Sequence, residues 1–307
     1  MVSVAGRDDL TLVVLAAGRA RRYGGCKPLA PVGPGGEAVL DFAVGDAFAG
    51  GFRTVVLVLN PDTGPSIRYR VETTWPSSLD VRFAVQERPL GTVDAVLAAA
   101  DHLVDGAPFA VANADDIYGV EALAALAEHL VTNDEESALV GFRLRNSVVS
   151  DAPVTRAICR TRDGWLAAIQ ERRQVHPDAS GGFVSDDGLE PARIDADELV
   201  SVNLWGFAKG MRKTLEATMA AAADAGEDRE VLLPEMVEEI VEGRGPAGGS
   251  GLRFAVLETD SRCIGVTHPG DLELVQAELT RQVASGERAA SPWEGAAGSR
   301  TGRSSAT

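Results

Sequence analysis

The sequence has 307 residues, of which 45% are hydrophobic, and its 45 acidic and 29 basic side chains give a net charge of −16. A chain of this length can bury a large core, and its acidic balance argues against nonspecific binding to nucleic acid. It contains no apolar run of the roughly 20 residues that a membrane span needs, and its first residues lack the apolar stretch of a signal peptide. We therefore expect a cytoplasmic protein that binds neither nucleic acid nor membrane.

The cysteines Cys26, Cys159 and Cys263 are far apart and form no CxxC pair. This usage is typical of a reducing compartment and argues against a disulfide scaffold or a structural zinc site. The sequence does not predict the oligomeric state.

Segments typical of strands and of helices alternate through the first half of the chain. The strands are expected at Thr11–Ala17, Thr54–Asn60, Val81–Gln86, Phe109–Asn113 and Ala138–Arg143, and the helices at Ala38–Ala49, Thr92–Leu103 and Val120–Val131. Such alternation predicts a mainly parallel sheet with helices on both faces. Ligands of such sheets bind at the carboxyl ends of the strands, and Gly18, Gln86 and Asp115 each follow a strand end.

The second half has a different pattern. Arg162-Asp163-Gly164, between two β-rich segments, predicts a hairpin, and the polar, Gly- and Asp-rich residues 174–198 predict a mobile loop. The other elements are expected as strands at Val200–Phe207 and Leu252–Leu257 and as helices at Met211–Ala223, Val231–Val241 and residues 267–283. The composition after Ala284 predicts a disordered tail over residues 285–307.

The segment Leu12–Leu29 carries the strongest chemical signal. An apolar strand leads into a Gly- and Arg-rich loop that contains no acidic residue. Its four cationic residues are Arg19, Arg21, Arg22 and Lys27. Small residues let the backbone approach a phosphate closely. The spacing matches neither a Walker A loop nor GxGxxG. Taken alone, the segment also fits a strand-to-loop turn with solvated arginines.

Two further motifs follow strand ends. Gln86 begins a turn shaped by Pro89 and Gly91, and its neutral amide can both donate to and accept from a nucleobase. The adjacent carboxylates Asp115 and Asp116 end an apolar strand, where a hard cation such as Mg²⁺ would offset the cost of their burial. The alternatives are a plain strand–turn–helix connection and an exposed acidic turn.

In this order the motifs resemble those of the sugar-1-phosphate nucleotidylyltransferases, whose first strand leads into LAAGxG[ST]Rxxxx(P)KPLxPV. The resemblance spans roughly residues 11–275. It implies a GT-A-like, Rossmann-like α/β fold, with a mainly parallel sheet flanked by helices and an inserted mixed α+β sugar-binding subdomain. The single domain would cover residues 1–284, with an NTP-binding half at 10–150, an acceptor-binding half at 151–260 and a closing helix at 261–284. The implied reaction joins an NTP and a sugar 1-phosphate to give an NDP-sugar and pyrophosphate.

The resemblance also assigns roles to particular residues. Arg22 and Lys27 would stabilise charge during attack on the α-phosphorus, and Asp115 would hold Mg²⁺. For the second metal ligand the nearby acids are Asp260 and Asp271, and we expect Asp260 because Asp271 suits the first turn of a helix. The remaining nucleotide-binding residues would be Leu15, Ala16, Ala17, Gly18, Arg19, Gln86, Pro89, Gly91 and Thr92. The acceptor would be bound by Glu171, Arg172 and Asn203. Gln86 favours UTP or dTTP over a purine nucleotide.

The chain departs from the family pattern at Ala20, Arg21 and Gly265, the last standing where the family's second metal-binding acid is expected. Three other readings therefore stay open. They are cytidylyl or other nucleotidyl transfer to a non-sugar phosphate or phosphonate, glycosyl transfer on a GT-A fold, and non-catalytic sensing of a nucleotide sugar.

Overall fold

A computed structural model describes residues 10–18, 25–226, 229–245, 252–268 and 270–294. Its strands are β1 (Thr11–Ala16), β2 (Thr54–Leu59), β3 (Asp80–Val85), β4 (Phe109–Asn113), β5 (Asp116–Ile117), β6 (Ser137–Arg143), β7 (Val154–Arg162), β8 (Trp165–Pro177), β9 (Phe183–Ser185), β10 (Arg193–Ile194), β11 (Leu199–Ser201), β12 (Trp205–Phe207), β13 (Phe254–Thr259) and β14 (Ile264–Gly265). The helices are α1 (Val39–Gly50), α2 (Gly64–Thr74), α3 (Thr92–Ala98), α4 (Val120–Thr132), α5 (Met211–Asp224), α6 (Leu233–Val241) and α7 (Asp271–Ser285), and short 3₁₀ turns span Lys27–Leu29, Ala100–His102 and Leu144–Asn146.

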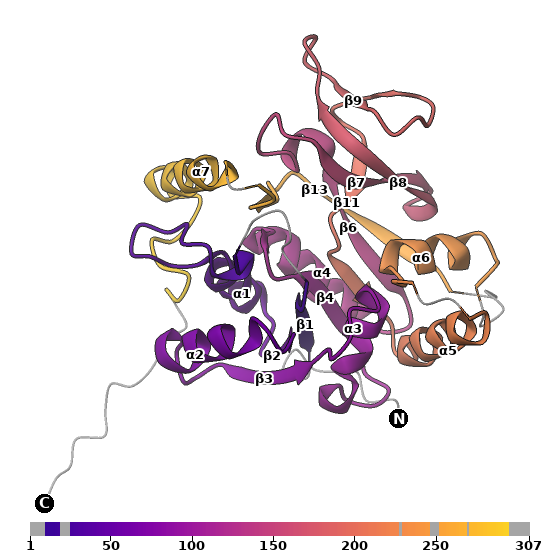
Figure 1. Ribbon diagram of the computed structural model, residues 1–307, viewed down its shortest axis with the longest axis horizontal. Coiled ribbons are helices and arrows are strands. Elements are labelled where there is room, and N and C mark those ends of the chain that lie inside the picture. The colour runs from indigo at the N-terminus through magenta and orange to yellow at the C-terminus, as the bar shows by residue number, and fades with distance from the viewer. Residues whose placement is uncertain (1–9, 19–24, 227–228, 246–251, 269, 295–307) are drawn as a thin grey trace, which may run out of the picture.

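One large sheet organises the molecule (Figure 1), with strand order β10-β9-β8-β7-β11-β6-β12-β4-β1-β2-β3 and β13 beside β6. The strands β4, β1, β2 and β3 are parallel neighbours, and β13 runs parallel to β6. Antiparallel β12 lies between β4 and β6, and the strands beyond β6 pair antiparallel. The predicted mainly parallel α/β sheet flanked by helices is confirmed.

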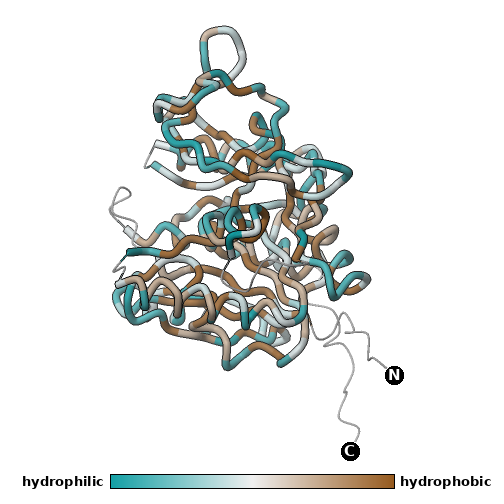
Figure 2. Tube along the Cα trace, turned by 90° about the vertical axis from the view of Figure 1, so that its right-hand side faces the viewer, coloured by the Kyte–Doolittle hydropathy of each residue, from teal (hydrophilic) through white to brown (hydrophobic). Residues whose placement is uncertain are grey.

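Helices cover both faces of this sheet because its central strands are apolar on both sides. In β1, Leu12 and Val14 pack into one core cluster with residues of α1, α2 and α4, whereas Val13 packs into a second cluster with residues of α3, α5 and α6. This alternation follows from the two-residue period of a strand. Along the trace, hydrophobic stretches run through the interior and hydrophilic ones lie mostly at the periphery (Figure 2).

Two expectations about the second half are corrected. The segment 174–198 is not a plain loop, because β8 continues to Pro177 and β9 and β10 follow. The strand expected at Val200–Phe207 is divided into β11 and β12 at Asn203, whose φ of 62° is incompatible with a continuous strand. In the first half, the sequence analysis did not predict helix α2.

The expected tail is also corrected at its start. After α7, residues 286–294 pack against α1 and α2 instead of leaving the molecule. Arg288 forms a buried ion pair with Asp46 of α1, and Trp293 contacts Trp75 with ring centroids 5.1 Å apart. None of the helices in the described part of the chain is long and apolar enough to cross a membrane.

Candidate active site

A cavity of about 400 Å³ lies at the carboxyl ends of the parallel strands. Because β1, β3 and β4 run in the same direction, Gly18, Gln86 and Asp115 reach the same edge of the sheet. The residues around the cavity are Leu15, Ala17, Gly18, Gln86, Pro89, Gly91, Thr92, Ala95, Asn113, Asp115, Glu230 and Leu232. The structure thus brings together most of the predicted nucleotide-binding residues. Ala16 is instead buried in the core on the opposite face of β1.

Lys27 and Asp115 meet at this edge. The Lys27 Nζ atom lies 3.8 Å from Asp115 Oδ2, and the two side chains are 16% and 34% exposed. Burial raises the pKa of the Asp115 carboxyl, the neighbouring Asp116 raises it further, and Lys27 opposes both. The pKa of Asp115 is thus raised to about 6, and an added cation would favour its charged form.

The donor set fits Mg²⁺. Within the described residues there is no cluster of three or more metal-ligating side chains. Mg²⁺ is commonly held by one or two protein carboxylates while phosphate oxygens and water complete its shell. Asp115 lines a cavity large enough for a nucleotide's phosphates, and it could supply the protein's share with Asp116 next to it in the chain.

Asp116 is held by its surroundings. Asn113 Nδ2 donates to Asp116 Oδ2 at 2.9 Å, and β14 pairs with β5 so that Gly265 lies opposite Asp116. A Cβ atom at position 265 would lie 2.1 Å from Asp116 Oδ1. Glycine at this position leaves room for the Asp116 carboxylate, which explains the departure at 265 in physical terms.

Asp260 does not join this site. It lines a different cavity, with Gly119 and Arg262, and its backbone carbonyl accepts a hydrogen bond from Asn146 Nδ2 at 3.1 Å. The structure does not place Asp260 at the cavity that Asp115 lines, so its role as second metal ligand stays a prediction, and no step below uses it.

The turn after β3 is fixed by contacts with a distant segment. Gly91 has a φ of 99°, and a Cβ atom there would lie 2.3 Å from the carbonyl oxygen of Val231. Val231 N donates to Leu90 O at 2.9 Å, and Leu233 N donates to Thr92 Oγ1 at 2.8 Å. Only glycine fits at position 91, because both the backbone angle and the close approach exclude a side chain.

The three predicted acceptor residues do not line the cavity. The Arg172 side chain is 2% exposed, and its guanidinium pairs with Asp187 and donates to the carbonyls of Leu189 and Pro191. The predicted acceptor-binding role does not fit Arg172, because its donors are already engaged inside the protein. The Arg172 guanidinium in turn holds the pKa of Asp187 well below its usual value.

Glu171 and Asn203 have partners of their own. Glu171 Oε1 accepts from Arg173 Nε at 2.9 Å, and Asn203 Oδ1 accepts from Trp205 Nε1 at 3.1 Å. Their acceptor-binding roles stay predictions. Arg19 and Arg22, like Ala20 and Arg21, lie outside the described residues, so the contacts predicted for Arg19 and Arg22 also stay predictions.

Sequence reasoning missed Ala95, Asn113, Glu230 and Leu232, which also line the cavity. Asn113 belongs to the same strand end as Asp115 and could have been read from that motif. Glu230 and Leu232 come from a segment far along the chain, and no local pattern connects them to Gln86.

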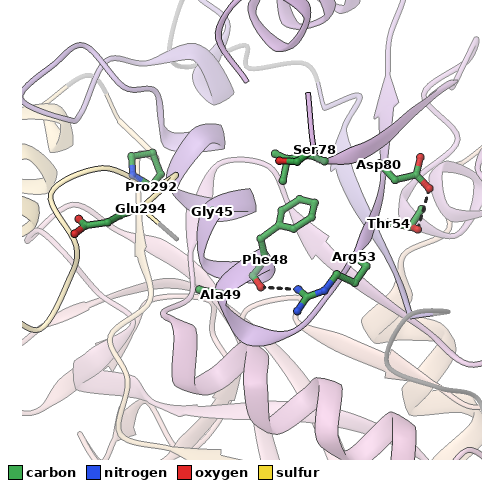
Figure 3. A pocket seen from close by; sticks show the side chains of 10 residues that line it. Gly45, Phe48, Ala49, Arg53, Thr54, Ser78, Asp80, Pro292 and Glu294 are labelled. Carbon is green, nitrogen blue, oxygen red and sulfur yellow. Dashed lines mark hydrogen bonds between the residues drawn. The ribbon is translucent and has the colours of Figure 1, made fainter. Parts of the chain in front are cut away.

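A larger cavity, of about 650 Å³, lies at the opposite ends of the strands (Figure 3). It is bounded by α1, the starts of β2 and β3, and residues 292–294. Arg53 donates to the carbonyls of Phe48 and Phe52, and Asp80 pairs with Arg82 and accepts from Thr54. The side chains of Arg53 and Asp80 are thus already engaged by nearby protein groups. The described residues of this cavity therefore offer no group of free side chains that points toward one bound molecule.

Comparison with known proteins agrees with this geometry. No curated protein sequence matches the chain. Solved structures with the same fold include a Bacillus anthracis protein assigned as a glucose-1-phosphate thymidylyltransferase, bound to sucrose (TM-score 0.63, 12% identity, 88% of this chain and 94% of that one). They also include a UDP-glucose pyrophosphorylase complexed with UDP-glucose (TM-score 0.60, 16% identity, 88% and 98%). A third is the inositol-1-phosphate CTP transferase from T. maritima (TM-score 0.59, 12% identity, 88% and 96%).

A family model for the MobA-like NTP transferase domain matches residues 12–179, which is more than half of the chain and includes β1, the turn after β3 and Asp115. The protein is a nucleotidyltransferase that belongs to the MobA-like NTP transferase domain family.

Proposed function

We propose that this protein joins a nucleoside triphosphate, UTP or dTTP by preference, to a sugar 1-phosphate and releases pyrophosphate. The observation that carries the proposal is that Lys27 lies 3.8 Å from Asp115, which lines one cavity with Gln86 and Gly91. A cation and a carboxylate beside a pocket with a base-reading amide suit a bound nucleoside triphosphate. The fold shared with a UDP-glucose pyrophosphorylase supports the same reading.

Each part of the site has a task in this reaction. An oxygen of the acceptor phosphate attacks the α-phosphorus, and the bond to the pyrophosphate leaving group breaks with its electron pair going to pyrophosphate. Lys27 stabilises the charge that builds on the triphosphate, and we propose the same for Arg22. Asp115, with Asp116 beside it, would hold Mg²⁺, which when bound neutralises phosphate charge. The turn at Gly91 places the base.

A second candidate is cytidylyl transfer to a phosphate that is not on a sugar. The likeness to the T. maritima inositol-1-phosphate CTP transferase favours it, because the two chains share the fold over most of their lengths. The chemistry at the α-phosphorus is the same, so Lys27 and Asp115 keep their roles. Only the base and the acceptor differ.

The test is a matrix of the four NTPs and dTTP against sugar 1-phosphates and inositol 1-phosphate, with Mg²⁺ and continuous detection of pyrophosphate. We expect pyrophosphate and an NDP-sugar with UTP or dTTP. Activity only with CTP and inositol 1-phosphate would establish the second candidate. Release of UDP or dTDP from a nucleotide sugar without pyrophosphate would establish glycosyl transfer, and nucleotide binding with no turnover would indicate a sensor.

A further inference from the structure

The Gln86 amide at the wall of the cavity has a fixed polarity. Gln86 follows β3 and is 7% exposed. Its Nε2 donates to the carbonyl of Gly91 at 3.0 Å and to Oδ2 of Asp94 at 2.8 Å. An amide nitrogen has two hydrogens to donate, so these two bonds use both of them.

The two partners determine which end of the amide faces them. A backbone carbonyl accepts only, and an ionised carboxylate accepts only. If the amide were turned over, Oε1 would face two acceptors and both contacts would be repulsive. The assignment of Nε2 to Gly91 and Asp94 is therefore dictated by chemistry.

The oxygen of the same amide is left for a ligand. The described residues provide no donor to Gln86 Oε1, and they leave no buried side-chain nitrogen or oxygen without a partner. Gln86 lines the cavity, so a ligand bound there can reach this oxygen. A base in this cavity meets an acceptor and must bring an N–H group to it.

We propose that Asp94 is a specificity-determining positioning residue, which holds the Gln86 amide so that the site selects uracil or thymine through the N3–H group. Cytosine has an unprotonated N3 and would present an acceptor to an acceptor. The inference rests on the proposed function only in taking this cavity as the base site. Asp94 itself, in the first turn of α3, acts through Gln86 and does not contact the base.

Three substitutions of Asp94 separate an effect on the orientation of the Gln86 amide from a general loss of folded structure. Asp94→Asn keeps an oxygen that can accept from Nε2, so the amide keeps its orientation. Asp94→Ala removes one of the two acceptors and leaves only Gly91 O to orient the amide. Asp94→Lys replaces the acceptor with a donor, which favours the inverted amide with Nε2 turned toward the base.

The measurement is calorimetric binding of UTP, CTP and N3-methyl-UTP to the full chain with Mg²⁺ and without any sugar phosphate. Because UTP and CTP carry the same triphosphate, the ratio of their dissociation constants cancels a general change in phosphate affinity. Thermal unfolding of each variant checks that it is folded. No turnover is needed, so a failure of the proposed reaction would show separately as binding without pyrophosphate release.

We expect the wild type to bind UTP at least about tenfold more tightly than CTP or N3-methyl-UTP, since a buried acceptor left without a donor loses at least that factor. Asp94→Asn should keep the UTP/CTP ratio within about threefold, Asp94→Ala should reduce it, and Asp94→Lys should reduce it about tenfold or invert it. The proposal is overturned if the wild type binds N3-methyl-UTP as tightly as UTP, prefers CTP, or binds no pyrimidine nucleotide. An unchanged ratio in folded Asp94→Ala would also overturn it, even if Asp94→Lys fails to fold.

Discussion

The buried ion pair between Arg172 and Asp187 gives a quantitative prediction about stability. The two side chains are 2% and 7% exposed, with Arg172 Nε 2.8 Å from Asp187 Oδ2. The same carboxylate accepts from the backbone nitrogens of Arg173 and Leu189, each at 3.0 Å. Asp187→Ala would leave the guanidinium buried without its counter-charge and would free two backbone donors.

Removing one partner of a buried ion pair costs about 3–5 kcal/mol. We therefore expect Asp187→Ala to lower the free energy of unfolding by about that amount, as measured by urea denaturation followed by circular dichroism. The adjacent Asp186 offers a matched control, because its side chain is 71% exposed and pairs with His176. Asp186→Ala should cost less than about 1 kcal/mol.

The comparison of these two neighbouring variants isolates burial, since the chemical change is the same. A loss below about 1 kcal/mol in Asp187→Ala would refute a structural role for the pair. It would also return Arg172 to the list of candidate acceptor ligands, because its guanidinium would then be free to leave Asp187.

Three further predictions concern pH and two glycines. Because folding lowers the pKa of Asp187, the ion pair contributes fully to the free energy of unfolding above the unfolded pKa of about 4, and this contribution is lost as the pH falls below it. The difference in the free energy of unfolding between wild type and Asp187→Ala should therefore shrink when it is measured at increasingly acid pH. Gly91→Ala combines a positive φ with a Cβ 2.3 Å from Val231 O, and should cost more than the roughly 1–3 kcal/mol of backbone strain alone while weakening UTP binding in calorimetry. Gly265→Ala should displace the Asp116 carboxylate and weaken Mn²⁺ binding, measured by electron paramagnetic resonance, with little change in melting temperature.

Two other glycines provide the controls. Gly106 has a φ of 73° with open space around it, so Gly106→Ala shows strain without collision. Gly270 also has open space at its Cβ position and an ordinary φ of −70°, so Gly270→Ala should leave Mn²⁺ binding unchanged. Equal stability losses for Gly91→Ala and Gly106→Ala, or unchanged Mn²⁺ affinity in Gly265→Ala, would contradict the packing described for these turns.

The part of the site that follows parallel strands could be read from the sequence. Strand β4 was predicted with its observed bounds, and the ends of β1 and β3 with shifts of one residue. Once strands run in the same direction, their carboxyl ends meet by geometry. The positions of Gly18, Gln86 and Asp115 at one cavity therefore followed from local patterns alone.

The parts that depend on distant segments could not be read in this way. Arg172 at a charged strand end looks the same whether it binds a ligand or an internal carboxylate, and the short strands β9 and β10 beyond the hairpin decide the outcome. In the sequence, Gly265 stands where the family has a metal-binding acid. Only the pairing of Gly265 with Asp116 in the structure shows why glycine is needed there. The contact of Val231 with Gly91 joins segments with no shared sequence signal.

The central claim is that Lys27 and Asp115 act on one triphosphate, and steady-state pyrophosphate release tests it most directly. The comparison is among wild type, Lys27→Ala, Asp115→Asn and the control Lys213→Ala, which removes an exposed lysine of α5. Lys27→Ala and Asp115→Asn should each lower kcat/KM more than about tenfold, or about 1.4 kcal/mol in the barrier, with melting temperatures and Lys213→Ala activity unchanged. Retention of more than about a tenth of wild-type activity by both site variants would contradict the account.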